Sequence, residues 1–541
     1  MNLTRNSDQA KNLKPFSEIP GPRGLPIVGS LFDMVRYASN AGDSAYVHQI
    51  LLKYGPIVKL SVLGKTLVVV SSPDAAAKVF RAEGKYPVRL YSQADVSWIY
   101  TNAGSPPAIA FAVGEQWKHV RSLSAKQIVP QRVANYAPGL CEIGDRFMRY
   151  IRHKRDSDGV VEDVNRALVK WAFQGIGYMT LGEKLDTFDE SKKDLQEFEK
   201  ISLDYAKNVE VIVFAPPLYK FFPTKAYRDF KRATDCMYEK ASHILKDKYD
   251  KMVEAINSGV VDEAKAISLM EQWLIEGKLT QKEILTLCCD MLAAGIETSS
   301  LTATFLLHEL AKHPELQEEL YQEVSSIVGD RSSISFDDCQ KMTLVRCCIK
   351  EILRLQAPTT GTSRVIDEDI EIGGYHIPAK TQVIFSTYTA SRNSKYVEDP
   401  TSFRPERWTR DSAESIDPFV SLPFGFGSRM CYGRRLVELE LYILLSKLSQ
   451  NFRLSTKQQS LKLVQTVFTR PGTRASASLV TSAVASSGFL MGCAGQGTQG
   501  IRSLNNTRSQ MKPVSSQLTT GRVHNMLSKP ESLPLTGVPP T

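Results

Sequence analysis

The chain has 541 residues and carries 67 Lys and Arg against 58 Asp and Glu, a formal charge of +9. Hydrophobic residues make up 42%, and the 33 Gly and 27 Pro follow no period, which excludes a mainly disordered, collagen-like or coiled-coil chain. Residues 472–541 hold six Lys and Arg against one acid and so supply +5 of the charge, leaving +4 for the rest. A nucleic-acid-binding surface is therefore not indicated.

The N-terminal residues 1–19 are polar and are predicted to be mobile. They lack the apolar centre of a secretory signal, and their mix of basic and acidic residues matches a transit peptide only in part. The Pro- and Gly-rich residues 20–26 then form a stiff hinge. Residues 57–62 and 66–71 are predicted to be the two strands of a hairpin that turns at Leu63-Gly64-Lys65.

The pattern is mostly helical after Pro73. A long helix is predicted from the capping-box pair Thr280 and Glu283 to about Leu310. Further helices are expected at about 344–355 and from just after Cys431 to about Gln450, with short strands near 365–383. No stretch approaches the roughly 18–20 unbroken apolar residues of a membrane-spanning helix.

The last segment, 472–541, is rich in Ser, Thr, Gly and Pro and is predicted to be disordered. The folded domain is therefore expected to cover 20–471. Nine cysteines, an odd number without a metal-type CxxC, argue against a disulfide framework and for a reducing compartment.

The most informative stretch is 423–435, PFGFGSRMCYGRR, in which Cys431 precedes a helix. The helix N-terminus stabilises a thiolate, so the pKa of this thiol is expected to fall. The three glycines permit tight turns and leave room for a flat ligand, Phe424 can cover the sulfur, and the Arg429 cation suits a carboxylate. A lone thiolate is a poor zinc site but a good axial ligand for haem iron.

This loop resembles the haem-binding signature of the cytochrome P450 superfamily, and the resemblance extends over roughly 20–471. It implies a mainly α fold with a smaller β portion. It also implies haem b as the cofactor, with Cys431 as the metal ligand. A lone cysteine is more often a small buried hydrophobe, but the whole pattern reverses that interpretation.

Glu297 and Thr298 lie in the middle of the long predicted helix, in AGIETS. A mid-helix Thr can bond a carbonyl of its own preceding turn, and Gly295 removes bulk, so the helix can open locally. The resemblance implies that this pair is catalytic, supplying protons during oxygen activation. The alternative is a surface Glu beside a helix Thr.

Two further groups of residues match the family by position. The resemblance implies that Trp117, Arg121 and Arg364 contact the haem propionates, each of them otherwise an ordinary surface residue. It also implies a buried network of Glu351, Arg354 and Arg407, and we predict that this network holds the cysteine loop in place.

The chain shows no convincing flavin or nicotinamide site, so electrons must come from a partner. Basic residues at Arg346, Lys350, Arg434 and Arg435 resemble the mitochondrial clan, which receives electrons from a small acidic ferredoxin and its NADPH-dependent reductase. Generic solvated charge is the alternative. The clan implies a mitochondrial location, on the matrix side of the inner membrane.

The apolar, Pro-interrupted residues 209–227 are either an access lip that touches a membrane or part of the core. The predicted function is insertion of one oxygen atom from O2 into a lipophilic substrate, sterol- or steroid-like by clan analogy alone. The alternatives are a haem-binding protein without turnover, as a sensor or inactive splice form, a xenobiotic-oxidising monooxygenase, and a haem-thiolate isomerase.

Overall fold

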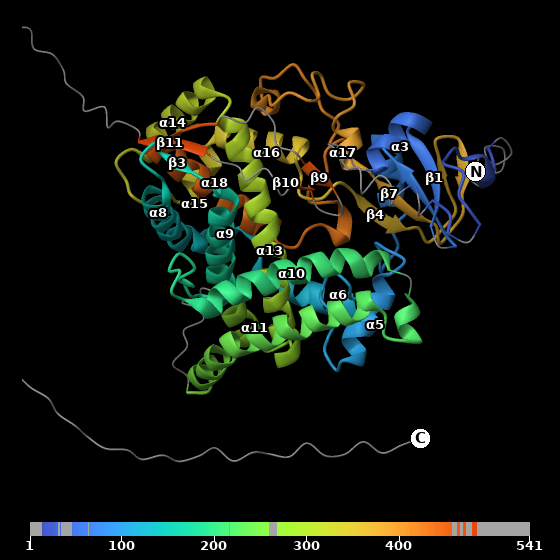
Figure 1. Ribbon diagram of the computed structural model, residues 1–541, viewed down its shortest axis with the longest axis horizontal. Coiled ribbons are helices and arrows are strands. Elements are labelled where there is room, and N and C mark those ends of the chain that lie inside the picture. Colours follow the sequence, from blue (N-terminus) through green and yellow to red (C-terminus); the bar gives the residue numbers. More distant parts are fainter. Residues whose placement is uncertain are drawn as a thin grey trace, which may run out of the picture. The chain divides into compact units, whose positions relative to one another are not determined.

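Helices dominate the computed structural model of this chain, and short strands form a smaller β portion (Figure 1). The fold class predicted from the sequence is therefore confirmed. The structure describes residues 13–26, 28–30, 33, 46–62, 64–215, 217–258, 268–456, 463–465, 469–471 and 479–483.

The helices of this part of the chain are α3 Tyr46–Tyr54, α4 Pro73–Arg81, α5 Gln93–Asn102, α6 Gly114–Ser124, α7 Pro130–Val133, α8 Ala137–Lys154, α9 Val164–Leu181, α10 Lys193–Phe214, α11 Lys225–Asn257, α12 Leu269–Glu276, α13 Gln281–Leu310, α14 Pro314–Val328, α15 Phe336–Lys341, α16 Thr343–Leu355, α17 Thr387–Ala390 and α18 Arg434–Asn451. The strands are β1 Ile57–Val62, β2 Lys65–Val70, β3 Val160–Val161, β4 Thr362–Val365, β5 Ile370–Ile372, β6 Tyr375–Ile377, β7 Gln382–Phe385, β8 Phe452–Ser455, β9 Leu463–Gln465, β10 Thr469–Pro471 and β11 Leu479–Ala483.

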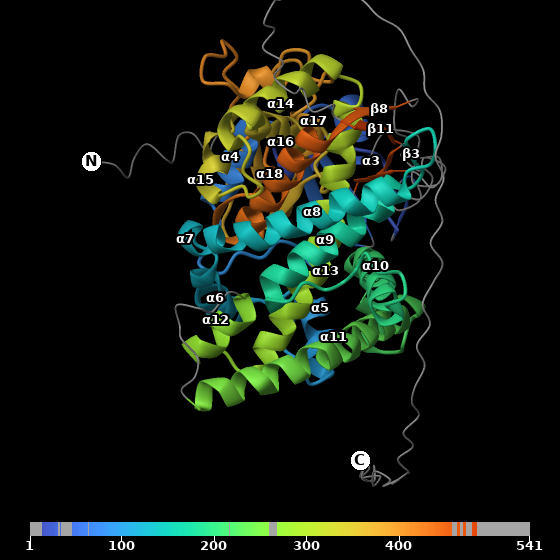
Figure 2. The same ribbon diagram turned by 90° about the vertical axis from the view of Figure 1, so that its left-hand side faces the viewer.

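Helix α13 runs through the middle of the helical part, beside α9 and near α10 and α11 (Figures 1 and 2). Its predicted capping box is present, because Thr280 and Glu283 each accept from the other's backbone N–H. The helix is long and apolar enough to cross a membrane, yet 72% of its most hydrophobic window is buried inside the protein. Packing within the core therefore explains its composition.

The predicted hairpin is confirmed as β1 and β2, which pair antiparallel from Ile57–Val70 to Val62–Lys65. The strands form a four-stranded sheet in the order β1-β2-β7-β4, with β2 and β7 parallel. The strands predicted near 365–383 are β4 to β7. Side chains of this sheet, of α4 and of β5 and β6 form a cluster of buried apolar residues that is separate from the larger helical core.

The folded part extends beyond both predicted boundaries. Lys14 pairs with the turn between β5 and β6, and Ile19 is buried, so residues 14–19 are part of the domain. At the other end, β11 pairs with β8 and β3 although it lies inside the segment predicted as disordered. Partners far away in the sequence order these short pieces, so local composition did not reveal them. The remainder of 472–541 lies outside the described residues.

Candidate functional site

The cysteine loop is a tight turn followed directly by α18. The Cys431 N–H donates to the Phe424 carbonyl at 2.8 Å, which closes the loop on itself. Gly425 and Gly427 have φ values of +69° and +72°, which explains why glycine stands at both positions. Gly433 has an ordinary φ of −85°, so the turn does not require it. A Cβ at 433 would meet nothing within 4 Å, which leaves open space beside Cys431.

The environment of Cys431 differs from the prediction in one respect. Its side chain is accessible, yet the surrounding protein is dense enough that burial raises the pKa of the thiol. The backbone N–H groups of Gly433 and Arg434 and the Arg121 and Arg89 cations act against this rise without overcoming it. The predicted fall in pKa is therefore wrong for the thiol as it stands, because desolvation outweighs the helix terminus.

Four arginines gather beside this loop. Arg121 donates to the Met430 carbonyl at 2.8 Å, and Arg429 donates to the carbonyls of Pro87 and Ala112 at 2.8 and 3.0 Å. The Arg429 guanidinium also stacks on the Trp117 ring at 3.9 Å. Arg364 donates to Glu83 at 2.5 Å, and Arg89 donates to the Ala110 carbonyl. Of the predicted propionate ligands, the structure thus places Trp117, Arg121, Arg364 and Arg429 around one region.

Positive charge exceeds negative charge in this arginine cluster. Burial and the neighbouring arginines lower the pKa of Arg429 to about 9, and burial with Arg364 lowers that of Arg89 to about 10. Glu83 is the acid paired with the cluster among the described residues, and the buried Nη1 of Arg429 has no hydrogen-bond partner there. A ligand with two carboxylates would relieve this imbalance, so the cluster fits the two propionates of a haem.

Sequence reasoning missed Glu83 and Arg89. Glu83 joins Arg364 to the cysteine loop, because it also accepts from the backbone N–H and hydroxyl of Ser428, both at 3.1 Å. These partners lie 281 and 345 positions away, so no local pattern could have revealed the role. A Cβ on Gly427 would lie 2.4 Å from this carboxylate, which is a second reason for glycine at 427.

The predicted catalytic pair lies on α13. The Thr298 hydroxyl donates to the Ala294 carbonyl at 2.8 Å, as a mid-helix threonine was expected to do. Thr298 and Ala294 keep accessible surface, whereas Glu297 is buried. Gly295 has a packing role: a Cβ there would lie 2.8 Å from Cγ1 of Ile176, so the glycine allows α9 to pack closely against α13.

The predicted structural network is assembled around one buried carboxylate. Arg354 donates to both oxygens of Glu351 at 2.9 and 2.7 Å, and Arg407 donates to Oε1 at 3.0 Å. The Trp408 indole and the Arg404 backbone N–H add bonds of 2.8 and 3.0 Å. The remaining guanidinium donors reach carbonyls of the segment before the cysteine loop, at Ser391, Glu398, Asp399, Pro400 and Ser402. Arg407 also pairs with the Glu414 carboxylate, so the network contacts the segment at 391–402 and Glu414.

The four basic residues predicted to bind a partner lie on two helices that contact each other, α16 and α18. Lys350 and Arg434 are exposed, and Arg434 pairs with Glu438 of its own helix at 2.8 Å. Arg346 is half-buried, and Arg435 uses one guanidinium nitrogen to bind the Ile128 carbonyl. Lys350 and Arg434 are therefore the most available to a partner.

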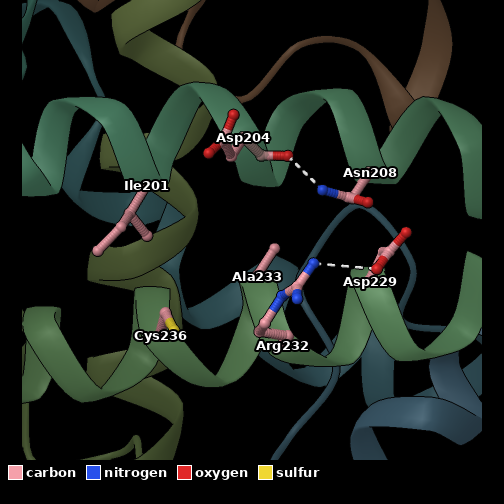
Figure 3. Close-up of a pocket in the computed structure, with 7 residues that line it drawn as sticks. All are labelled: Ile201, Asp204, Asn208, Asp229, Arg232, Ala233 and Cys236. Atoms are coloured by element: carbon pink, nitrogen blue, oxygen red, sulfur yellow. Dashed lines mark hydrogen bonds and ion pairs between the residues drawn. The ribbon is translucent and has the colours of Figure 1, made fainter.

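A separate surface pocket of about 330 Å³ lies between α10 and α11 (Figure 3). Figure 3 shows its charged and polar lining, in which Arg232 pairs with Asp229 at 3.0 Å and Asn208 donates to the Asp204 carbonyl at 2.8 Å. The pocket shares no lining residue with the cysteine loop or with α13. Ionised side chains make it unsuitable for a lipophilic molecule.

The described residues contain no group of three or more His, Cys, Asp or Glu side chains that could hold a metal ion. A metal bound at Cys431 would therefore need its other ligands from a cofactor, as in a metalloporphyrin. A single cysteine ligand and a nearby arginine cluster fit the same cofactor, because a porphyrin supplies the other metal ligands and its carboxylates can pair with the arginines.

Comparison with known proteins places these features in context. The family model described as "Cytochrome P450" matches residues 19–475. Cytochrome P450 10 from Lymnaea stagnalis is 31% identical over 82% of this chain and 82% of its own length. The mitochondrial cholesterol side-chain cleavage enzyme of Oncorhynchus mykiss is 29% identical, covering 84% and 87%, and the mitochondrial sterol 26-hydroxylase of Mus musculus is 29% identical, covering 82% and 84%.

Proposed function

We propose that this chain, which belongs to the cytochrome P450 family and is a P450 monooxygenase, oxidises sterol-like lipids with electrons from a ferredoxin. The family holds haem b through a cysteine thiolate, and we assign that ligand to Cys431. When bound, the haem supplies the reductive activation of O2 and the transfer of one oxygen atom to the substrate. The observation that most supports this proposal is the accessible Cys431 thiol beside a buried arginine cluster.

The protein's own residues would orient the haem and supply protons for the reaction. Arg121, Arg364 and Arg429 neutralise the propionates and fix the orientation of the ring. Thr298 has its hydroxyl on the accessible side of α13, where it can hold a proton for transfer. Buried Glu297, one residue earlier, would help relay protons from solvent to this threonine.

The electron donor is proposed from charge and from the relatives. Lys350 and Arg434 offer exposed positive charge on α16 and α18, the helix that follows the cysteine. An acidic ferredoxin would be steered to such a surface, and salt would weaken this steering. Two of the relatives named above are called mitochondrial, which supports a mitochondrial location for this chain as well.

A membrane contact is proposed at the end of α10 and the turn that follows. Val211, Leu218, Phe221 and Phe222 are 54%, 46%, 85% and 54% exposed. Lys220 lies within this run and Lys225 follows it, and they pair with Asp95 and Asp229 respectively. Ile212 and Tyr219 of the same segment are buried in the core. Exposed aromatic side chains flanked by cations favour a lipid interface, so these side chains support the access-lip interpretation. Carbonate extraction tests it: release of all the protein by a salt wash alone would contradict the contact.

The experiment that tests the function uses purified holoprotein with a ferredoxin, its reductase and NADPH. We expect NADPH-dependent oxidation of at least one member of a sterol panel, with product detected by mass spectrometry. A thiolate-type spectrum of the reduced carbonyl complex without any product would instead favour a haem-binding protein without turnover. Product formed without NADPH would favour an isomerase. Oxidation of drug-like molecules but of no sterol would favour the xenobiotic-oxidising alternative.

A further inference from the structure

A carboxylic acid lies on the accessible face of α13, away from the residues used so far. Asp290, Ala294 and Thr298 keep accessible surface, whereas their neighbours at 291–293 and 296–297 are buried. Their spacing of four residues places them in one row along the helix. These three positions thus form an accessible row on a helix whose adjacent positions are mostly buried. Asp290 and Thr298 are about 12 Å apart along the helix axis.

The surroundings of Asp290 are polar but carry no cation among the described residues that shift its pKa. The Ile109 N–H donates to Oδ2 at 2.7 Å, which ties the segment between α5 and α6 to α13. Tyr100 of α5, Tyr205 of α10 and Tyr238 of α11 lie close enough for the Asp290 charge to raise their pKa values further. The hydroxyl groups of Tyr100 and Tyr205 form a hydrogen bond of 2.6 Å with each other. Oδ1 has no hydrogen-bond donor from the described part of the chain.

From this arrangement we infer that Asp290 accepts a hydrogen bond from a hydroxyl group of the substrate and so orients a lipophilic alcohol along α13. This inference rests on the proposed function and adds the polar group that the substrate must carry. The oxidised carbon would then lie toward Thr298, roughly 12 Å from the anchoring hydroxyl. A partly buried carboxyl without a second donor gains from a ligand that supplies one.

The protonation state gives the anchor a second property. Burial raises the pKa of Asp290 to about 7, with the Ile109 bond acting against the rise. Tyr100, Tyr205, Tyr238 and Cys289, which face it, have raised pKa values and stay neutral between pH 6 and 8. At pH 8 the carboxylate only accepts hydrogen bonds, whereas at pH 6 the protonated acid can also donate to a ketone.

The test measures the dissociation constants of cholestanol and of cholestan-3-one for the holoprotein by equilibrium dialysis at pH 8. We expect the wild-type protein to prefer the alcohol by about 10-fold or more. In Asp290→Asn the amide oxygen can still accept from Ile109, which turns the NH2 group toward the ligand. The preference should therefore disappear or reverse. Asp204→Asn, at an exposed aspartate of α10, is the matched control and should keep the wild-type ratio.

A role in anchoring the loop alone would change both dissociation constants equally. An unchanged ketone-to-alcohol ratio in Asp290→Asn would therefore overturn the inference, as would a wild-type ratio that is the same at pH 6 and pH 8. Tighter binding of the matching 3-aminosteroid than of the alcohol would replace the hydroxyl assignment with an ammonium. If the wild-type protein binds none of these ligands, the sterol-like class proposed above fails instead, so the two failures are distinguishable.

Discussion

Replacing Glu351 with Gln should destabilise this protein more than an ordinary loss of charge. The side chains of Glu351, Arg354 and Arg407 are completely buried, and the carboxylate accepts five hydrogen bonds. An amide can accept at one end only. It leaves the buried Arg354 guanidinium without a counter-charge and Arg407 with Glu414 as its one remaining acid partner among the described residues. Breaking a buried ion pair in this way costs about 3–5 kcal/mol, or roughly 150-fold to several thousand-fold in the unfolding equilibrium.

Urea denaturation followed by circular dichroism measures this loss. The matched control is Glu197→Gln, because Glu197 also pairs across two helices, with Lys240 at 2.8 Å, but its side chain is 53% exposed. An exposed pair contributes about 0–1 kcal/mol. Equal destabilisation by the two substitutions, or a loss below about 1 kcal/mol for Glu351→Gln, would refute the reasoning.

The same carboxylate predicts a pH dependence. Burial alone raises the pKa of Glu351, but its bonds to Arg354, Arg404 and Trp408 outweigh burial and hold the pKa below the usual 4.5. Its contribution to stability is therefore complete above about pH 4.5 and is lost as the pH falls through the lower value of the folded state. This part of the acid transition should be absent from Glu351→Gln. A variant that keeps the wild-type acid profile would contradict this assignment.

Three further predictions concern the helices around the site. Thr298→Ala should keep haem binding but divert electrons from NADPH into peroxide, whereas Thr302→Ala, whose hydroxyl donates to the Thr298 carbonyl at 2.9 Å, should stay coupled; equal coupling in both variants would reject the proton-transfer role. Arg346→Glu with Lys350→Glu should slow reduction by ferredoxin in stopped-flow traces, most strongly at low salt. The same charge change at Lys200 and Lys207 of α10 should leave the rate of reduction unchanged. A salt-independent, unaltered rate in the Arg346 and Lys350 variant would exclude the proposed docking surface. Gly295→Ala should cost about 1–3 kcal/mol in denaturant unfolding because its Cβ meets Ile176. Ile176→Ala removes the Cγ1 that this Cβ meets, so Gly295→Ala should cost less in the Ile176→Ala background than in the wild-type chain. An equal loss in both backgrounds would point to another cause.

Local patterns carried the prediction of the fold and of the cysteine loop. The capping box at Thr280, the hairpin around Gly64 and the helix after Cys431 each depend on neighbours within a few residues, and the structure contains all three. The network of Glu351, Arg354 and Arg407 was recognised through family positions, and the structure brings these residues together. The roles proposed for them stay predictions.

Burial and long-range pairing lay beyond the sequence. No local signal linked Glu83 to Arg364 or placed Arg89 beside the loop, since the partners lie hundreds of positions apart. The pKa of Cys431 rises because the surrounding fold desolvates it, an effect that the helix terminus alone could not indicate. Asp290 likewise becomes a candidate anchor only where α5, α10 and α11 converge on α13. The local sequence thus determined that the cysteine loop and the helices form. Tertiary packing decided which charged groups meet, because desolvation and Coulomb energy depend on distance in space.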